Sequence, residues 1–130
     1  MLTKSPLTEE ALKELAALGG TWTFNDFHFD GKKTDFVAYW VFKDNTVAEH
    51  LDSNVLRCVG IVAVDPTKSP KTIDINFVRG TEARIGMFQG IYELDGDTLK
   101  VCLGTEKGRP TEMASAEGSK NLLIVFKRKK

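Results

Sequence analysis

The sequence predicts an all-β fold: a closed antiparallel up-and-down barrel of about eight strands that follows one short α-helix. Three observations predict it. Helical periodicity is confined to residues 8–18. After Gly20, about eight segments rich in β-branched and aromatic residues follow one another with short, turn-rich links, as in an antiparallel meander. A sheet of that many strands would keep unpaired edges unless it closed on itself.

The helix is expected over about residues 8–18. Thr8 is a suitable N-cap, and Glu9 and Glu10 suit the positive end of the helix dipole. Gly19-Gly20 ends the helix. A short apolar stripe at helical spacing can be buried only against another part of the chain. It consists of Leu12, Leu15, Ala16 and Leu18.

The strands are recognised by apolar–polar alternation between turn signals. The clearest hairpin has Asp95-Gly96 at its turn, because Asp-Gly tolerates the positive φ that both central positions of a type I′ turn require. Asp30-Gly31 is a second hairpin signal, and residues 104–120 form the longest connection. In chain order we expect strands at 20–29, 34–42, 46–51, 55–64, 72–79, 84–94, 98–103 and 121–128.

Composition bounds the class of protein. The 130 residues suffice for one domain, residues 1–130, with the barrel over about 20–128. Acidic and basic residues balance at 18 each, so no overall charge attracts nucleic acid or an anionic membrane. No apolar run approaches the ~20 residues of a membrane span, and the N-terminus lacks the apolar core of a signal peptide. We expect a soluble protein, cytoplasmic as written or the mature part of an exported one; monomer and dimer stay open.

Metal and redox chemistry have little support in the sequence. Cys58 and Cys102 fall in separate expected strands and are predicted to be packed thiols. The only two histidines are His28 and His50, and a three-ligand site would need their strands to converge. Surface histidines are the simpler interpretation, so we expect no metal and no cofactor.

A resemblance to lipocalins begins at Gly20-Thr21-Trp22, which matches the G-x-W signature of their first strand. In that family a short helix precedes the motif, the tryptophan plugs the closed end, and an arginine of the last strand packs over the indole. Here Arg128 lies at the end of the last expected strand. The resemblance implies that Gly20, Trp22 and Arg128 form this structural signature, and a guanidinium does stack well on an aromatic face.

A closer resemblance covers nearly the whole chain, although the stretch 40–56 follows no recognised pattern. The sequence resembles a lipocalin-like (calycin) bacterial domain family of unknown function that is abundant in planctomycetes and often exported. That family implies a fold and no activity. The matching segments, in order, are Gly20-Thr21-Trp22, Asp65-Pro66-Thr67, Pro70 to Ile75, Gly90 to Leu99, Arg109-Pro110-Thr111-Glu112 and Phe126-Lys127-Arg128.

The leading functional hypothesis is that a small, largely apolar molecule binds non-covalently inside the barrel. An eight-stranded barrel lies at the boundary between a filled interior and one that holds a ligand, so a filled aromatic core is the alternative. Many aromatic residues are expected inside, including Phe24, Phe36 and Phe42. The predicted ligand-binding residues are Trp40, Phe77, Phe88 and Tyr92 as apolar walls, with His50, Arg57 and Tyr39 as polar groups.

Two rival functions stay open. One is an enzyme that positions a hydrophobic substrate for cyclisation or isomerisation, with Tyr39, His50 or Glu49 as its acid or base. The other is an interaction module with a filled barrel that uses the 104–120 loop or an exposed apolar patch. Asp74 and the segment Arg109-Pro110-Thr111-Glu112 are expected to tie down loops, as such polar side chains commonly do.

Overall fold

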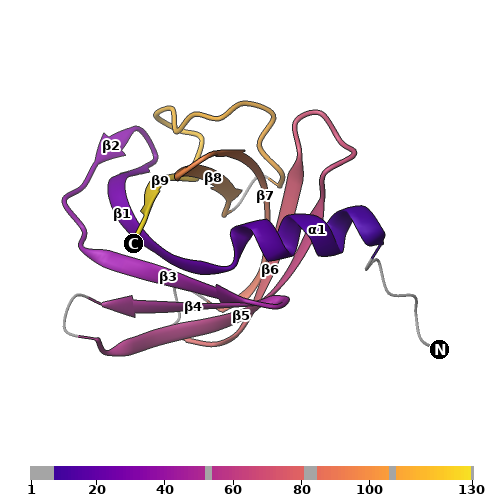
Figure 1. Ribbon diagram of the computed structural model, residues 1–130. Helices are drawn as coiled ribbons and strands as arrows, with labels where there is room; N and C mark the ends of the chain where they lie inside the picture. The colour runs from indigo at the N-terminus through magenta and orange to yellow at the C-terminus, as the bar shows by residue number, and fades with distance from the viewer. Residues whose placement is uncertain (1–7, 52–53, 81–84, 106–107, 130) are drawn as a thin grey trace.

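The computed structural model describes residues 8–51, 54–80, 85–105 and 108–129, which form one short helix and a ring of antiparallel strands (Figure 1). The elements are α1 (Glu9–Leu18), β1 (Gly20–Phe29), β2 (Lys32–Lys33), β3 (Ala38–Lys43), β4 (Thr46–Leu51), β5 (Leu56–Asp65), β6 (Thr72–Arg79), β7 (Gly86–Asp95), β8 (Thr98–Gly104) and β9 (Asn121–Arg128).

The sheet closes into an eight-stranded up-and-down barrel, which confirms the predicted fold class. From β3 to β9 each strand pairs with the next, and β1 joins the two ends of this series. The start of β1 pairs with β3, with Trp22 opposite Trp40. The same strand pairs with β9 from Trp22 to Phe29. The two-residue strand β2 extends the barrel as a small hairpin with the end of β1.

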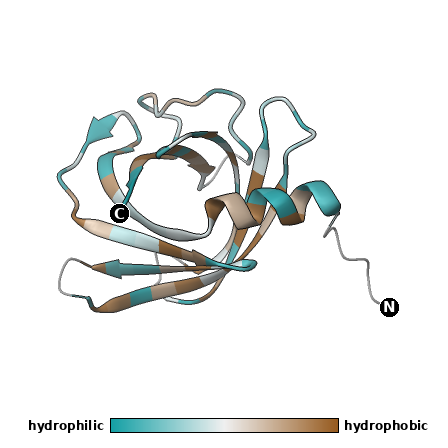
Figure 2. Ribbon diagram, in the orientation of Figure 1, coloured by the Kyte–Doolittle hydropathy of each residue, from teal (hydrophilic) through white to brown (hydrophobic). Residues whose placement is uncertain are grey.

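Helix α1 begins and ends where the sequence predicts. Thr8 is the N-cap, and its side chain accepts a hydrogen bond from the amide of Ala11 at 3.1 Å. The helix lies across one end of the ring, and its second half carries more apolar residues than its first turn (Figures 1 and 2). Its buried side chains, which face β3 and β5, are Ala11, Leu15 and Leu18.

Trp22 and Arg128 form the expected plug at the helix end of the barrel, here called the closed end. The guanidinium carbon of Arg128 lies 4.2 Å from the centre of the Trp22 ring. The indole N–H of Trp22 donates to the carbonyl of Leu18 at 2.8 Å, and Arg128 donates to the carbonyls of Gly19 and Ala17 at 3.1 and 3.0 Å. The last strand therefore fastens the helix to the first strand.

Most strand bounds agree with prediction within one or two residues, and the expected strand 34–42 is the exception. Strand β3 begins only at Ala38, and residues 34–37 cross the other end of the barrel outside any strand. On this edge β1 pairs with β3 only from Gly20 to Thr23 and with β2 only at His28 and Phe29, so residues 34–37 span the gap between the two pairings, where the backbone N–H of Thr34 donates to the carbonyl of Phe27 at 2.8 Å. Phe36 continues the alternation of Ala38 and Trp40, so periodicity gave no sign of the boundary. Residue 84, the predicted start of β7, lies outside the described residues.

The turn of the β7–β8 hairpin differs from the predicted type I′ turn. Asp95 pairs with Thr98, so the two central residues are Gly96 and Asp97. Only Gly96 has positive φ, 60°, which is the φ pattern of a type II′ turn with glycine first. The type I′ pattern occurs in the β1–β2 hairpin, where Asp30 and Gly31 have φ of 53° and 85°.

The long connection between β8 and β9 is tied to the outside of the barrel, as predicted for Asp74 and Arg109. The Arg109 guanidinium donates to the Asp74 carboxylate at 2.7 Å and to the carbonyl of Gly90 at 2.8 Å. Cys102 is buried beneath this connection, and its thiol donates to the carbonyl of Ala114 at 3.4 Å. Cys58 and Cys102 are both thiols, as predicted.

Candidate functional site

A cavity of about 400 Å³ opens at the end of the barrel opposite α1, here called the mouth. Its residues lie at the end of β1, at the start of β5, β7 and β9, directly after β8, and in the crossing segment before β3. The volume falls within the roughly 300–1,000 Å³ typical of small-molecule sites. The lining residues are Phe27, Phe29, Thr34, Phe36, Arg57, Phe88, Thr105 and Leu122.

Beneath the cavity the barrel is filled by aromatic side chains. Trp40, Phe77 and Phe126 are almost completely buried. The ring of Trp40 lies 4.9 Å from that of Phe126 and 6.5 Å from that of Phe77, between centroids. Phe77 in turn meets the cavity-lining Phe88 edge to face at 5.5 Å. The barrel is thus packed with aromatic side chains beneath the cavity at the mouth.

A β-bulge in β1 directs two phenylalanines into the cavity. Phe24 is opposite Phe126 on β9, but Asp26 is opposite the neighbouring Val125, so Asn25 is an extra residue in the strand. Such an extra residue reverses the alternation of all later side chains. Phe27 and Phe29 therefore face the same interior as Phe24, although their parity along the chain is opposite.

A second bulge brings Arg57 into the site. Glu49 is opposite Cys58, whereas His50 is opposite Leu56, which leaves Arg57 as the extra residue of β5. Its side chain lies against the cavity, with the guanidinium carbon 5.1 Å from the centre of the Phe36 ring. Without the bulge, the inward parity of Cys58 would place Arg57 on the outer face.

Arg57 is paired with a carboxylate buried in the barrel wall. Glu49 has no exposed surface, and its Oε2 accepts a hydrogen bond from Arg57 Nη1 at 3.2 Å. Its Oε1 accepts from the indole N–H of Trp40 at 2.8 Å. A buried carboxylate is tolerated where a cation and further donors satisfy it, so the two contacts explain why Glu49 can lie inside.

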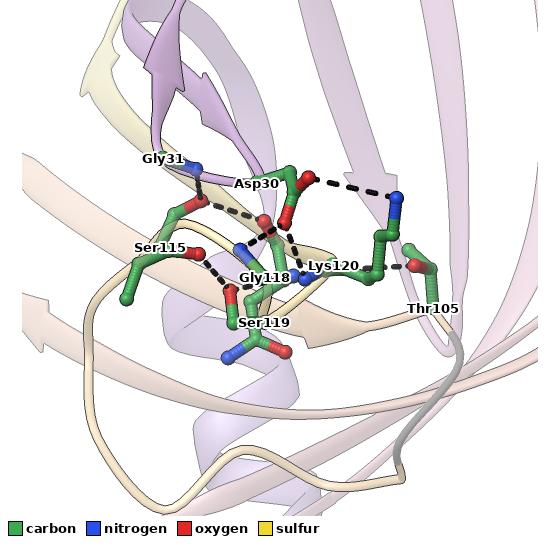
Figure 3. Close-up of polar contacts among 9 residues, drawn as sticks. Asp30, Gly31, Thr105, Ser115, Gly118, Ser119 and Lys120 are labelled. Carbon is green, nitrogen blue, oxygen red and sulfur yellow. Dashed lines mark hydrogen bonds and ion pairs between the residues drawn. The ribbon is translucent and has the colours of Figure 1, made fainter.

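The rim of the cavity is held by a loop clasp, defined here as Asp30, Thr105, Gly118 and Lys120 (Figure 3). Asp30 accepts from the backbone amides of Gly118 and Lys120 at 2.8 and 3.0 Å and lies 3.5 Å from the Lys120 ammonium. The hydroxyl of Thr105 donates to the carbonyl of Lys120 at 2.5 Å. These contacts hold the pKa of Asp30 below its usual value, and the backbone N–H of Lys120 contributes most.

The structure brings only part of the predicted site together. Arg57 and Phe88 line the cavity. Trp40 and Phe77 are inside the barrel but belong to the packed floor below it. Tyr92 also points inward, at the closed end, where its hydroxyl donates to Glu14 of α1 at 2.6 Å.

Tyr39 and His50 do not face the interior, which corrects the expectation that they contribute polar groups there. They are opposite one another on β3 and β4 and stack with ring centroids 4.9 Å apart. The neighbouring pair, Trp40 and Glu49, is the one that points inward. Side chains alternate along a strand, so the stacked pair of Tyr39 and His50 lies on the outer face. The carboxylate that faces the interior beside Trp40 belongs to Glu49.

Five of the lining residues were not predicted from the sequence to contact a ligand, and Phe36 was expected only as an aromatic residue of the interior. The missed residues are Phe27, Phe29, Thr34, Thr105 and Leu122. One signal was present: Trp22 and Phe24 have one parity, and Phe27 and Phe29 have the other. A switch of apolar parity inside one strand indicates a bulge. Thr34 and Thr105 lie outside the strands, where alternation gives no information.

The two histidines take no part in a ligand set that the structure describes. His28 Nε2 lies 3.3 Å from the carboxylate of Asp26, and His50 stacks on Tyr39. Within residues 8–51, 54–80, 85–105 and 108–129, no three His, Cys, Asp or Glu side chains gather as metal ligands would. Asp52, two residues after His50 in the sequence, lies outside these ranges.

Searches of protein-family models, curated proteins and solved structures gave no match to this chain. Among the described residues, no helix is both long and apolar enough to cross a bilayer.

Proposed function

We propose that the protein binds a small, largely apolar molecule in the cavity at the mouth of the barrel. The observation that carries the proposal is a cavity of about 400 Å³ with four phenylalanines and one half-buried arginine in its wall. Ligand sites in general combine a mostly apolar lining with a few placed polar groups. The ligand would lie over the packed floor and not deep inside the barrel.

Packing supports a preformed site. Two phenylalanines of the wall, Phe27 and Phe36, have ring centroids 5.4 Å apart, and the ring of the neighbouring Phe24 lies 5.8 Å from both. Rings held in this way lose little freedom when a ligand arrives, and a preformed site therefore binds at a lower entropic cost. The resemblance to lipocalin-like proteins agrees with a ligand at this end of a barrel.

The first test uses phenylnaphthylamine, an uncharged dye that fluoresces strongly in apolar surroundings. The unaltered protein is expected to enhance its emission in a saturable way, with one dye bound per chain. In Thr34→Trp the indole fills the cavity from an exposed position outside the strands, so the packed floor is undisturbed. We expect this variant to bind the dye at least about tenfold more weakly.

The matched control is Met87→Trp. Met87 is 61% exposed and lies on the outer face of β7, away from the cavity. The variant Met87→Trp adds the same indole to the surface and is expected to leave dye binding unchanged. Absence of saturable binding to the unaltered protein would refute the proposal. Equal weakening in both variants would show that the dye binds elsewhere.

A further inference from the structure

We infer that the cavity selects an uncharged ligand that presents a hydrogen-bond acceptor, such as a carbonyl oxygen, to Arg57, and that Glu49 enforces this choice by cancelling the charge of Arg57. The inference rests on the proposed function and adds the chemical class of the ligand. A lone arginine in an apolar pocket would favour a carboxylate, because the guanidinium binds carboxylates through paired hydrogen bonds. Here the pocket already contains that carboxylate.

The charge balance of the pair is the first step. Glu49 is completely buried and lies 3.2 Å from Arg57, whose side chain keeps 23% of its surface exposed. An anionic ligand that bound Arg57 would place a second negative charge beside one that cannot reach water. Like charges in a poorly solvated site repel strongly, so this arrangement is unfavourable.

In the ion pairs that the structure describes at the rim, each lysine is already paired with a carboxylate, so these lysines do not offset the negative charge of Glu49. Lys33, next to the cavity-lining Thr34, has its ammonium 3.6 Å from the carboxylate of Asp26. Lys120 of the loop clasp lies 3.5 Å from Asp30. These two rim pairs, like the pair of Arg57 and Glu49 at the cavity wall, each combine one cation with one carboxylate. The paired groups around the mouth therefore carry no net charge.

The hydrogen-bonding capacity of Arg57 is the second step. A guanidinium carries five N–H donors. In the part of the chain that the structure describes, the hydrogen bond from Arg57 to Glu49 uses one amino group, Nη1. The cation–π contact with Phe36 holds the guanidinium beside the cavity. A purely apolar ligand would remove water from the remaining donors without replacing its hydrogen bonds, which costs free energy. A neutral acceptor satisfies them without adding charge.

The test compares three ligands with the same ring system and the same point of attachment: methyl naphthyl ketone, naphthoate and ethylnaphthalene. Each is titrated against bound phenylnaphthylamine on the unaltered protein at neutral pH. We expect the ketone to displace the dye at the lowest concentration. Ethylnaphthalene and naphthoate should each bind at least about tenfold more weakly, the first for lack of an acceptor and the second because of its charge.

The outcomes separate the inference from the proposed function. Naphthoate binding more tightly than the ketone would overturn the inference and leave ligand binding intact. Ethylnaphthalene binding as tightly as the ketone would overturn it as well, because Arg57 would then not be engaged. If neither the dye nor any of the three compounds binds, the proposed function fails and the inference fails with it.

A variant tests the role of Glu49 as a positioning residue. Glu49→Gln removes the negative charge and leaves a single acceptor oxygen for two donors, Trp40 and Arg57. The preference for ketone over naphthoate should then fall by about tenfold or reverse, since Arg57 becomes an uncompensated cation. Glu93→Gln removes an exposed charge from the outer face of β7 and should leave the preference unchanged. An unchanged preference in Glu49→Gln would contradict the role assigned to Glu49.

Discussion

At the scale of single residues, Arg128 joins three parts of the closed end. Its guanidinium stacks on Trp22, donates to two carbonyls at the end of α1, and lies 3.2 Å from the carboxylate of Asp97 in the β7–β8 turn. Arg128→Lys keeps the charge but loses the planar stacking and most of the directed donors. We expect the free energy of unfolding to fall by about 1–3 kcal/mol, measured by urea denaturation.

Lys100→Met provides the comparison for Arg128→Lys. Lys100 is an exposed residue of β8, and its replacement should change the free energy of unfolding by less than about 0.5 kcal/mol. If Arg128→Lys is as stable as this control, the contacts of the guanidinium do not contribute to stability as described.

Individual residues also show which side chains could be placed inside the barrel from the sequence and which could not. Trp22 and Arg128 were predictable from the resemblance to lipocalins, which places both at the closed end, and the parity of the last strand agrees with it. Arg57 was assigned to the interior, although strict alternation with Cys58 would place it outside, and a bulge makes the assignment hold. His50 and Glu49 are adjacent in the chain, and only the strand register determines which of the two is buried.

At the scale of elements, the loop clasp connects the β1–β2 turn to the end of the β8–β9 connection. Asp30→Gly removes the carboxylate while glycine retains the positive φ of 53° at this position. We expect faster hydrogen exchange at the amides of Gly118 and Lys120, which donate to that carboxylate. Asp44→Gly is the matched control, since Asp44 also has a φ of 53° but lies in the β3–β4 turn. It should leave both exchange rates unchanged.

The clasp should also respond to acid. The pKa of Asp30 is lowered in the folded protein, chiefly by the backbone N–H of Lys120, so the ionised carboxylate favours the clasp. Its contribution is present above the unfolded pKa of about 4 and is lost as the pH falls through the lower folded value. Protection factors of the two amides should therefore fall in that acidic range in the unaltered protein and stay constant in Asp30→Gly. Equal pH dependence in both proteins would contradict this.

At the scale of the whole molecule, Tyr92 couples stability to alkaline pH. Burial, and then the hydrogen bond to Glu14, raise the pKa of Tyr92. The folded state thus keeps a proton that the unfolded chain releases above a pH of about 10, and the free energy of unfolding should decline there. Tyr92→Phe should lack this part of the decline, as followed by denaturant titrations at increasing pH.

Tyr39 is the other tyrosine of the chain and provides the control. Tyr39→Phe removes a phenolic hydroxyl from the outer face, where it donates to Asn54, and should keep the alkaline decline of the unaltered protein. The reverse pattern, with the decline lost in Tyr39→Phe and retained in Tyr92→Phe, would show that Tyr92 does not control it.

For the molecule as a whole, the sequence predicted the helix, the order of the strands and the closure of the barrel, because these follow from periodicity, turn residues and the cost of an open edge. The mouth was harder to predict. Phe27 and Arg57 reach it through bulges, and Thr34 reaches it through a segment without regular structure. Periodicity describes regular strands, whereas the site is built where that regularity is interrupted.

The division of the barrel into a packed end and a hollow end has a consequence for its evolution. Trp22, Trp40 and Arg128, which hold the closed end together, are separate from the residues that line the mouth. Substitutions at exposed lining positions such as Thr34 and Phe29 can reshape recognition with little effect on the packed end. Most changes that alter binding in other proteins also reduce stability, which limits how many can accumulate. This arrangement relaxes that limit and makes the barrel a scaffold whose specificity can diverge while its architecture persists.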